Sequence, residues 1–143
     1  WWNWDLPWDP TDCSRFVQVV LENVWITLER NSAMQWDQFS STWNMIEDLS
    51  QAEVWDLVFY KNTYESKNEI THVGIYMWNN EMINATWKKV QISKIDKYWK
   101  QHFKWVWKLS LFTKNSLSYL ITFKSSPISS PNTEAKILGI TIS

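Results

Sequence analysis

The chain carries one thiol, at Cys13, and thiols are among the side chains that serve as nucleophiles in proteins. Asp12 is a favoured N-cap residue, so we expect Cys13 in the first turn of a helix. The helix dipole and the unpaired amides of that turn would lower the pKa of the thiol. The backbone N–H groups of Cys13 and Ser14 are the predicted donors to an oxyanion. The alternative is an inert buried cysteine, which is the commoner role of a lone thiol.

A thiol nucleophile needs a base, and the sequence offers two histidines. His72 begins an apolar segment, where a polar ring is costly unless it is hydrogen-bonded or used in chemistry. His102 lies in a lysine-rich segment and is expected to be an ordinary surface residue. The pattern therefore favours His72 as the general base for Cys13.

Composition limits the classes of function. The chain has 143 residues, a formal net charge of -1 and a pI near 6.1, which fit one domain and do not suggest an electrostatic nucleic-acid binder. No apolar run approaches the roughly 18 residues of a membrane span. No signal peptide is seen, but the chain begins at Trp1 without Met, so we expect a fragment or a processed product. No cofactor is implied, and no His, Cys and carboxylate cluster suggests a metal site.

Hydrophobic periodicity predicts an α+β domain followed by a tail. Two helices are expected near the start, one from residue 13 and one over 32–39 opened by a serine cap, and residues 43–51 are left without an assignment. Strands are predicted over 56–61, 72–77, 82–86, 90–92 and 106–112. A further helix over 94–103 should point Ile95 and Tyr98 inward. We expect the domain to end near residue 112, and residues 113–143 to form a Ser/Pro-containing tail or linker.

Tryptophan is abundant and glycine is scarce, at 13 and 2 residues. Usual glycine content of about 7% predicts roughly ten in a chain of this length. Several tryptophans stand where a turn favours glycine, among them Trp55, Trp78 and the group Trp1, Trp2 and Trp4. One interpretation is an aromatic surface that binds sugars or peptides. The other is that the source reads UGA codons as glycine, which this sequence renders as Trp.

Five segments resemble, in order, the motifs of the NlpC family of cell-wall cysteine endopeptidases. Asp12-Cys13-Ser14-Arg15-Phe16-Val17 is similar to its Asp-Cys-Ser-Gly-Phe-Val motif, and residues 28–35 to its Leu-Pro-Arg-x-Ser-x-x-Gln segment. Residues 56–60 resemble its Gly-Asp-Leu-Val-Phe-Phe strand without the glycine, and residues 72–76 match its His-Val-Gly-Ile-Tyr strand. Residues 95–103 resemble its Tyr-Trp helix. The resemblance covers about residues 1–112.

The resemblance implies a papain-like fold, in which an N-terminal nucleophile helix packs on an antiparallel sheet of about five strands. It implies Cys13 as nucleophile, His72 as base and a polar orienting residue 12 positions later, which is Asn84. An asparagine oxygen can accept the imidazole N–H, as in Cys-His-Asn enzymes. Asp12, Arg15 and Ser32 are the candidate groove residues.

The implied activity is hydrolysis of an amide in a peptidoglycan stem or cross-link peptide through an acyl-enzyme. The bond expected by resemblance joins γ-D-glutamyl to a diamino acid. The implied place is the cell wall, the extracellular space or a virion, and a larger lytic or phage-tail protein is the expected context. Two alternatives stay open, namely an amidase or acyltransferase of the same fold, and a degenerate domain that only binds wall peptides.

Departures from the family concern its glycines. Trp25, Trp55, Trp78 and the Trp1-Trp2 pair fall on family glycines, whereas Trp99 falls where the family itself has tryptophan. This pattern favours the codon interpretation over an aromatic binding surface. Arg15 also replaces a family glycine, which would either crowd the groove or bind a substrate carboxylate. The replacement of a family proline by Glu29 should matter little.

Overall fold

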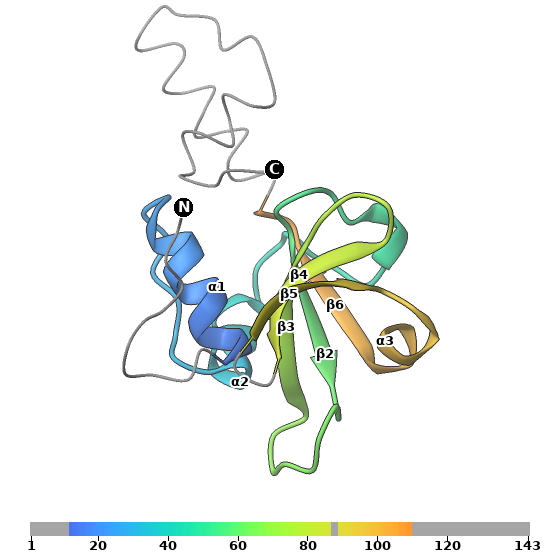
Figure 1. The fold of residues 1–143 in the computed structure, drawn as a ribbon. Helices are drawn as coiled ribbons and strands as arrows, with labels where there is room; N and C mark the ends of the chain where they lie inside the picture. The colour runs from blue at the N-terminus through green and yellow to red at the C-terminus, as the bar shows by residue number, and fades with distance from the viewer. Residues whose placement is uncertain (1–11, 87–88, 110–143) are drawn as a thin grey trace, which may run out of the picture.

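A computed structural model describes residues 12–86 and 89–109, which form one α+β unit (Figure 1). The predicted tail and the last three residues of the predicted closing strand lie outside the described residues, as do Trp1, Trp2 and Trp4. The elements in chain order are α1 (Cys13–Glu22), α2 (Ser32–Phe39), β1 (Met45–Ile46), a 3-10 turn η1 (Leu49–Gln51), β2 (Leu57–Lys61), β3 (Ile70–Tyr76), β4 (Glu81–Thr86), β5 (Lys89–Lys94), α3 (Lys97–His102) and β6 (Phe103–Trp107).

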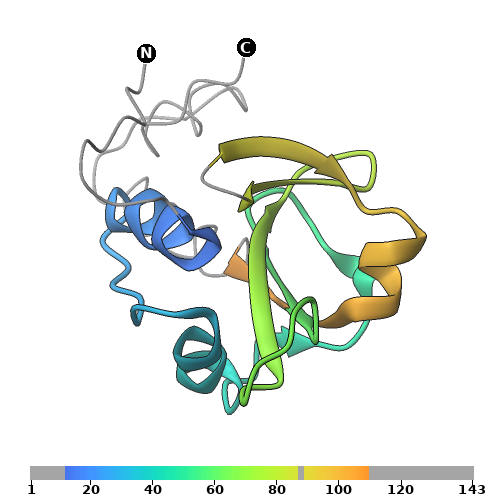
Figure 2. The same ribbon diagram turned by 60° about the horizontal axis from the view of Figure 1, so that its bottom comes forward.

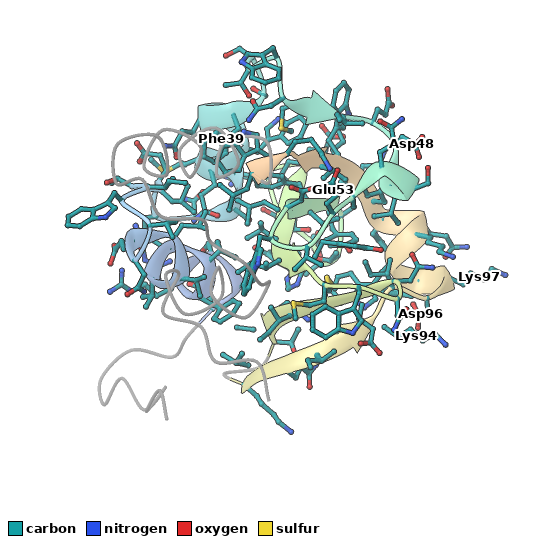
Figure 3. The ribbon with its side chains drawn as sticks, turned by 90° about the horizontal axis from the view of Figure 1, so that it is seen from above. Phe39, Asp48, Glu53, Lys94, Asp96 and Lys97 are labelled. Atoms are coloured by element: carbon teal, nitrogen blue, oxygen red, sulfur yellow. The ribbon has the colours of Figure 1, made fainter. Side chains whose placement is uncertain are left out.

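The strands form one antiparallel sheet in the order β1-β6-β2-β3-β4-β5. The predicted sheet of about five strands is confirmed, with the two-residue β1 added from the segment left without an assignment. Helices α1 and α2 cover one face of the sheet and α3 lies on the other side (Figure 2). Seen from above, Asp96 and Lys97 at the start of α3 lie across the molecule from α1 (Figure 3).

Short polar side chains begin each helix. Asp12 caps α1 by accepting a hydrogen bond from the Arg15 N–H at 2.7 Å, as the sequence predicts. Helix α2 has the expected bounds, but its cap is Asn31 and not Ser32, because the Asn31 side chain accepts from the Met34 N–H. Asp12 therefore sets the place of Cys13 as the first residue of α1.

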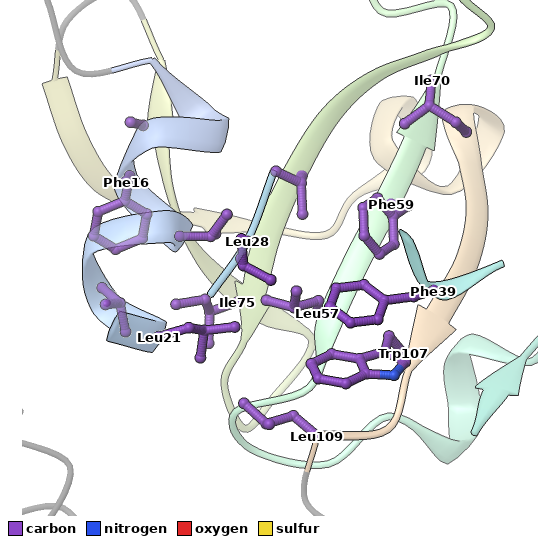
Figure 4. Packing of buried hydrophobic residues seen from close by; sticks show 14 of the residues in the cluster. Phe16, Leu21, Leu28, Phe39, Leu57, Phe59, Ile70, Ile75, Trp107 and Leu109 are labelled. Atoms are coloured by element: carbon purple, nitrogen blue, oxygen red, sulfur yellow. The ribbon is translucent and has the colours of Figure 1, made fainter. Parts of the chain in front are cut away.

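The main core lies between the sheet and the pair α1 and α2 (Figure 4). Phe16 and Leu21 extend from α1 into one side of it. On the other side the rings of Phe39 and Trp107 stack with their centroids 3.9 Å apart. A smaller cluster on the opposite face of the sheet packs Tyr60 with residues of β4 and the α3 segment. The apolar face of α1 is thus fixed on β3, which orients the end of the helix that carries Cys13.

The last helix differs from its prediction. It covers 97–102 and not 94–103, because the Asp96 side chain caps it by accepting from the Trp99 N–H. Ile95 is buried as predicted, but Tyr98 is 46% exposed and Trp99 turns inward instead. The closing strand begins at Phe103, earlier than the predicted residue 106. The shift matters for the site, since Trp99 packs against His72.

A buried ion pair joins the far end of the sheet to the loop before β2. Lys108 Nζ donates to Asp56 Oδ2 at 2.6 Å and to the carbonyl of Gln51 at 2.7 Å, and both charged side chains are almost fully buried. Removing one partner would leave an uncompensated buried charge. The pair thus holds the loop that leads into β2, one of the strands against which His72 is placed.

None of the helices within residues 12–86 and 89–109 has the length and apolar character that crossing a bilayer requires.

Candidate active site on the α1–β3 contact

The Cys13 thiol lies where the start of α1 meets β3. Backbone N–H groups of Val73, Ser14 and Cys13 itself lie near its sulfur and act to lower the pKa of the thiol. Val73 is the residue that follows His72 on β3, so the fold brings the thiol to the strand position next to the imidazole. Residues 60 positions apart in the chain, Cys13 and Val73, are thereby brought together.

Burial decides the protonation of Cys13. Desolvation raises the pKa of the thiol above its ordinary value, and the negative charge of Asp12 acts in the same direction. The N–H groups of Val73, Ser14 and Cys13 lower it by less than burial raises it. The expectation of a lowered pKa at the helix terminus is therefore wrong, because loss of water outweighs the amides of the first turn. The resting cysteine is a neutral thiol.

His72 is enclosed by aromatic rings from β2 and α3. Its partner across the β2–β3 ladder is Tyr60, and their ring centroids are 6.0 Å apart. The Trp99 ring packs closer, at 4.8 Å and an interplanar angle of 33°. His72 is 7% exposed as a result. Burial lowers the pKa of His72 to about 4, whereas its hydrogen bond with Asn84 acts to raise it.

Asn84 on β4 holds the far nitrogen of the His72 ring. Its Oδ1 lies 3.1 Å from His72 Nε2, and the Asn84 side chain is fully buried. Gly74 makes this approach possible, since a Cβ at residue 74 would lie 3.3 Å from Asn84 Cβ and 2.8 Å from Met82 Sδ. The glycine in the His-Val-Gly strand thus lets β4 come close enough for Asn84 to reach the imidazole.

A polar cluster borders the thiol at the start of α1. Arg30 binds the Asp12 carboxylate with two nitrogens, at 2.9 and 3.2 Å, and donates to Ser14 Oγ at 3.3 Å. Partial burial acts to raise the pKa of Asp12, but bonds from Arg30, the Arg15 N–H and Ser14 hold it below its ordinary value. Buried Gln35 fixes the arrangement by donating to the carbonyls of Ser14 and Glu29.

The three candidate groove residues differ in their exposure and in their contacts. Asp12 is exposed beside the thiol, whereas Ser32 is buried as the first residue of α2. Arg15 turns along α1, where it donates to Gln18 Oε1 at 2.8 Å and pairs with Glu22. The cation beside Asp12 and Ser14 is Arg30, which lies in the motif over 28–35 but is not one of the predicted groove residues.

Tyr64 and His102 are two further side chains whose surroundings the structure defines. Tyr64 lies in the β2–β3 connection and is 62% exposed. Desolvation raises its pKa, and the charges of Cys13 and Asp12 add to the rise, which places its hydroxyl in the electrostatic range of both. His102 is half-buried and not fully exposed as predicted, because its Nδ1 lies 2.8 Å from the Lys61 carbonyl. No pattern in the sequence pointed to Tyr64.

In the part of the chain that the structure describes, no group of three or more His, Cys, Asp or Glu side chains could hold a metal ion.

A helix with a thiol at its first residue, packed on an antiparallel sheet that carries a His–Asn pair, defines an α+β, papain-like domain. Residues 2–108 match the NlpC/P60 family, and the chain belongs to that family. This agrees with the family that the ordered motifs indicate.

Similar proteins include cell-wall enzymes and one non-catalytic relative. The chain is 37% identical over 102 residues to the bifunctional muramidase/DL-endopeptidase CwlT of Bacillus subtilis, covering 71% of this chain and 29% of CwlT. A Staphylococcus aureus structure, described as similar to lipoprotein and of the NLP/P60 family, superposes with a TM-score of 0.54 and 29% identity, over 64% of this chain and 30% of that one.

The RipD structure from Mycobacterium tuberculosis, described as a non-catalytic NlpC/p60 domain protein adapted to peptidoglycan binding, gives a TM-score of 0.53 at 18% identity. The match covers 68% of this chain and 66% of RipD, and at this identity it shows the fold alone. The chain spans less than a third of the length of CwlT. The two activities in the name of CwlT therefore belong to a protein much longer than this chain.

The buried imidazole predicts a pH dependence of stability. His72 has a pKa of about 4 in the fold and the ordinary 6.5 when unfolded, so between these values the unfolded chain binds a proton that the folded chain excludes. The contribution of neutral His72 to the free energy of unfolding is fully present above pH 6.5, and it is lost as the pH falls through 4. Going from pH 7 to about pH 4.5 should cost roughly 2–3 kcal/mol of unfolding free energy from this group.

Urea denaturation at the two pH values measures this cost. His72→Gln should remove it, and the matched His102→Gln should leave it in place. An equal pH dependence in the wild-type chain and in His72→Gln would contradict the assignment.

Proposed function

We propose that this domain is a peptidoglycan hydrolase that cuts a stem-peptide amide with Cys13 as nucleophile, His72 as base and Asn84 as orienting residue. The observation that carries the proposal is the meeting of the thiol with the strand position beside His72, whose other nitrogen is bound to Asn84. Membership of the NlpC/P60 family supports it, because matched relatives in that family are named endopeptidases.

Attack begins from the neutral pair. His72 Nε2 is engaged with Asn84, so Nδ1 is the nitrogen left to accept the thiol proton. As the proton moves to the imidazole, the Cys13 sulfur forms a bond to the substrate carbonyl carbon and the carbonyl π pair moves onto oxygen. A low pKa of His72 keeps its lone pair free near neutral pH, which a base requires.

The oxyanion is stabilised by backbone N–H groups at the start of α1. Those of Cys13 and Ser14 precede the first intrahelical bond, which runs from the Phe16 N–H to the Asp12 carbonyl. When the carbonyl reforms, the C–N bond breaks and the leaving amine takes the proton from His72. Water then attacks the thioester and gives a proton to His72, the C–S bond breaks to release the Cys13 thiolate, and the thiolate takes that proton back from His72.

The substrate class follows from the family and from the charges beside the thiol. The Asp12–Arg30 pair is half exposed and offers groups of both signs to a charged peptide. Peptidoglycan stem peptides carry such charges, and the bond we propose joins γ-D-glutamyl to a diamino acid. We place the domain in a longer, wall-associated or extracellular protein, in keeping with the greater length of its matched relatives.

Two other functions are less well supported. An amidase or acyltransferase could use the same Cys13–His72 pair on a different acyl group. A domain that only binds wall peptides has a counterpart in RipD, described as non-catalytic. The packed His72–Asn84 pair favours a catalytic domain. Binding alone requires neither a buried imidazole whose Nε2 is bound nor a thiol beside the next strand residue.

Purified muropeptides test the proposal. The wild-type chain should release fragments whose masses correspond to cleavage within the stem peptide, and Cys13→Ala should lower kcat by at least about a thousandfold. Asn84→Ala should lower kcat with little change in KM, and Asn84→His should retain more activity because a histidine nitrogen can also accept the imidazole N–H.

Thermal unfolding of each variant controls for folding, and Cys13→Ala should keep the wild-type Tm within a few degrees. Fragments cut outside the stem peptide, or products of acyl transfer, would support the amidase or acyltransferase function. Turnover that survives Cys13→Ala would overturn the peptidase mechanism.

A further inference from the structure

The two ends of the Asn84 side-chain amide face different partners. Asn84 Nδ2 donates to Ser93 Oγ at 2.9 Å and lies 3.4 Å from the carbonyl oxygen of Gln91, while Oδ1 faces His72. A carbonyl can only accept, and the Ser93 hydroxyl is free to accept as well, so the end that faces β5 must be the NH₂ group. The end that faces His72 is then the oxygen, which is an acceptor only.

This orientation fixes the imidazole tautomer. Because Asn84 Oδ1 can only accept, His72 Nε2 must carry the hydrogen, and Nδ1 must carry the lone pair. We propose that Ser93 on β5 is a positioning residue, which holds the Asn84 amide in the orientation that leaves His72 Nδ1 as the base for Cys13. Ser93 acts through Asn84, and no contact with the reacting atoms is proposed for it.

Without the Ser93 hydroxyl the amide keeps only the longer contact to the Gln91 carbonyl. A flipped Asn84 would then present its NH₂ group to His72 Nε2, which would have to accept, and the ring hydrogen would move to Nδ1. That tautomer cannot take a proton from the thiol. The loss should therefore fall on kcat and not on KM, since no groove residue is changed.

Nitrogen-15 NMR of the histidines tests this directly, because the chain has only His72 and His102 and His102→Gln assigns the pair. The wild-type chain should show His72 with hydrogen on Nε2. Ser93→Ala should populate the Nδ1–H form and lower kcat at least about tenfold, and Ser93→Thr should restore both. An unchanged tautomer in Ser93→Ala would overturn the inference.

A double-variant cycle separates orientation from general packing. In Asn84→Asp both side-chain oxygens are acceptors, so no flip can change the tautomer. Adding Ser93→Ala to Asn84→Asp should therefore leave the His72 tautomer unchanged, and a tautomer shift in that background would contradict the inference. The kinetic part rests on the proposed function, whereas the NMR part holds or fails whatever the substrate is.

A separate inference concerns Trp25, which lies in the turn that follows α1. Its N–H donates to the Glu22 carbonyl at 3.1 Å, and the Ile26 N–H donates to the Leu21 carbonyl at 3.0 Å. These bonds, with φ of 65° at Trp25, make a Schellman motif whose left-handed position is usually glycine. The Trp25 side chain is 96% exposed, so no packing offsets the unfavourable backbone.

Trp55 occupies a second position of the same kind. The Asp56 N–H donates to the Glu53 carbonyl at 3.0 Å, and φ of Trp55, the third residue of this turn, is 81°. Both values match a type II β-turn, in which the third residue favours glycine. Trp78 differs, because the positive φ angles of its turn fall on Asn79 and Asn80. Asparagine tolerates that conformation.

Other tryptophans sit in contacts that need an aromatic ring. Trp107 stacks on Phe39, and Trp36 packs edge-on against Phe59 and Trp105. The tryptophans thus divide by backbone angle, and Trp55 has the unfavourable angle although it packs partly against the main core. We infer that the source of this chain places glycine at positions 25 and 55, through a codon that this sequence renders as tryptophan.

Peptide mass spectrometry of the protein isolated from its source decides the matter. Glycine at positions 25 and 55 is the expected result, and tryptophan at either would overturn the inference. In the recombinant chain, Trp25→Gly should raise Tm by about 4–8 °C. The matched Trp43→Gly, at a 79% exposed residue without positive φ, should not raise it. A Tm that does not rise in Trp25→Gly would count against the backbone argument.

Discussion

The site depends on the burial of one imidazole. His72 is enclosed by Tyr60, Trp99 and Asn84, and this enclosure excludes water from the ring. An imidazole without water is held neutral and must place its N–H on a protein acceptor. The position of β4, the absence of a side chain at Gly74 and the orientation of Asn84 all follow from that single requirement.

The Cys13 thiol obeys the same constraint of burial. Cys13 is buried enough that desolvation outweighs the three backbone N–H groups around its sulfur, so thiol and imidazole are both neutral at rest. In the proposed mechanism, charge then forms on the pair only as substrate is attacked, when the amides of α1 can share it. The N–H groups at the start of α1 would thus stabilise the charge of the transition state more than they stabilise a resting thiolate.

Much of the fold could be predicted because its signals are local. The cap at Asp12, the apolar face of α1 and the strand around His72 each follow from short-range patterns. The choice of Asn84 came from spacing within a family resemblance, and the structure places its oxygen against His72.

What could not be predicted depends on contacts between distant elements. The inward turn of Trp99 follows from a cap one residue before α3, and the place of Arg30 follows from Gln35 binding two carbonyls. The raised pKa of Cys13 is a burial effect, which the sequence around a single residue does not show. Backbone angles added what composition could not, by separating Trp25 and Trp55, which have positive φ, from the other described tryptophans.

The pH dependence of Cys13 alkylation by iodoacetamide tests the neutral pair most directly, because Cys13 is the one cysteine of the chain. The account predicts a rate that rises with pH in a single step above the ordinary thiol value of 9.0, with no reactive thiolate near neutral pH. A reactive plateau that extends from pH 7 down toward the pKa of His72 would show a resting thiolate–imidazolium pair and would contradict it.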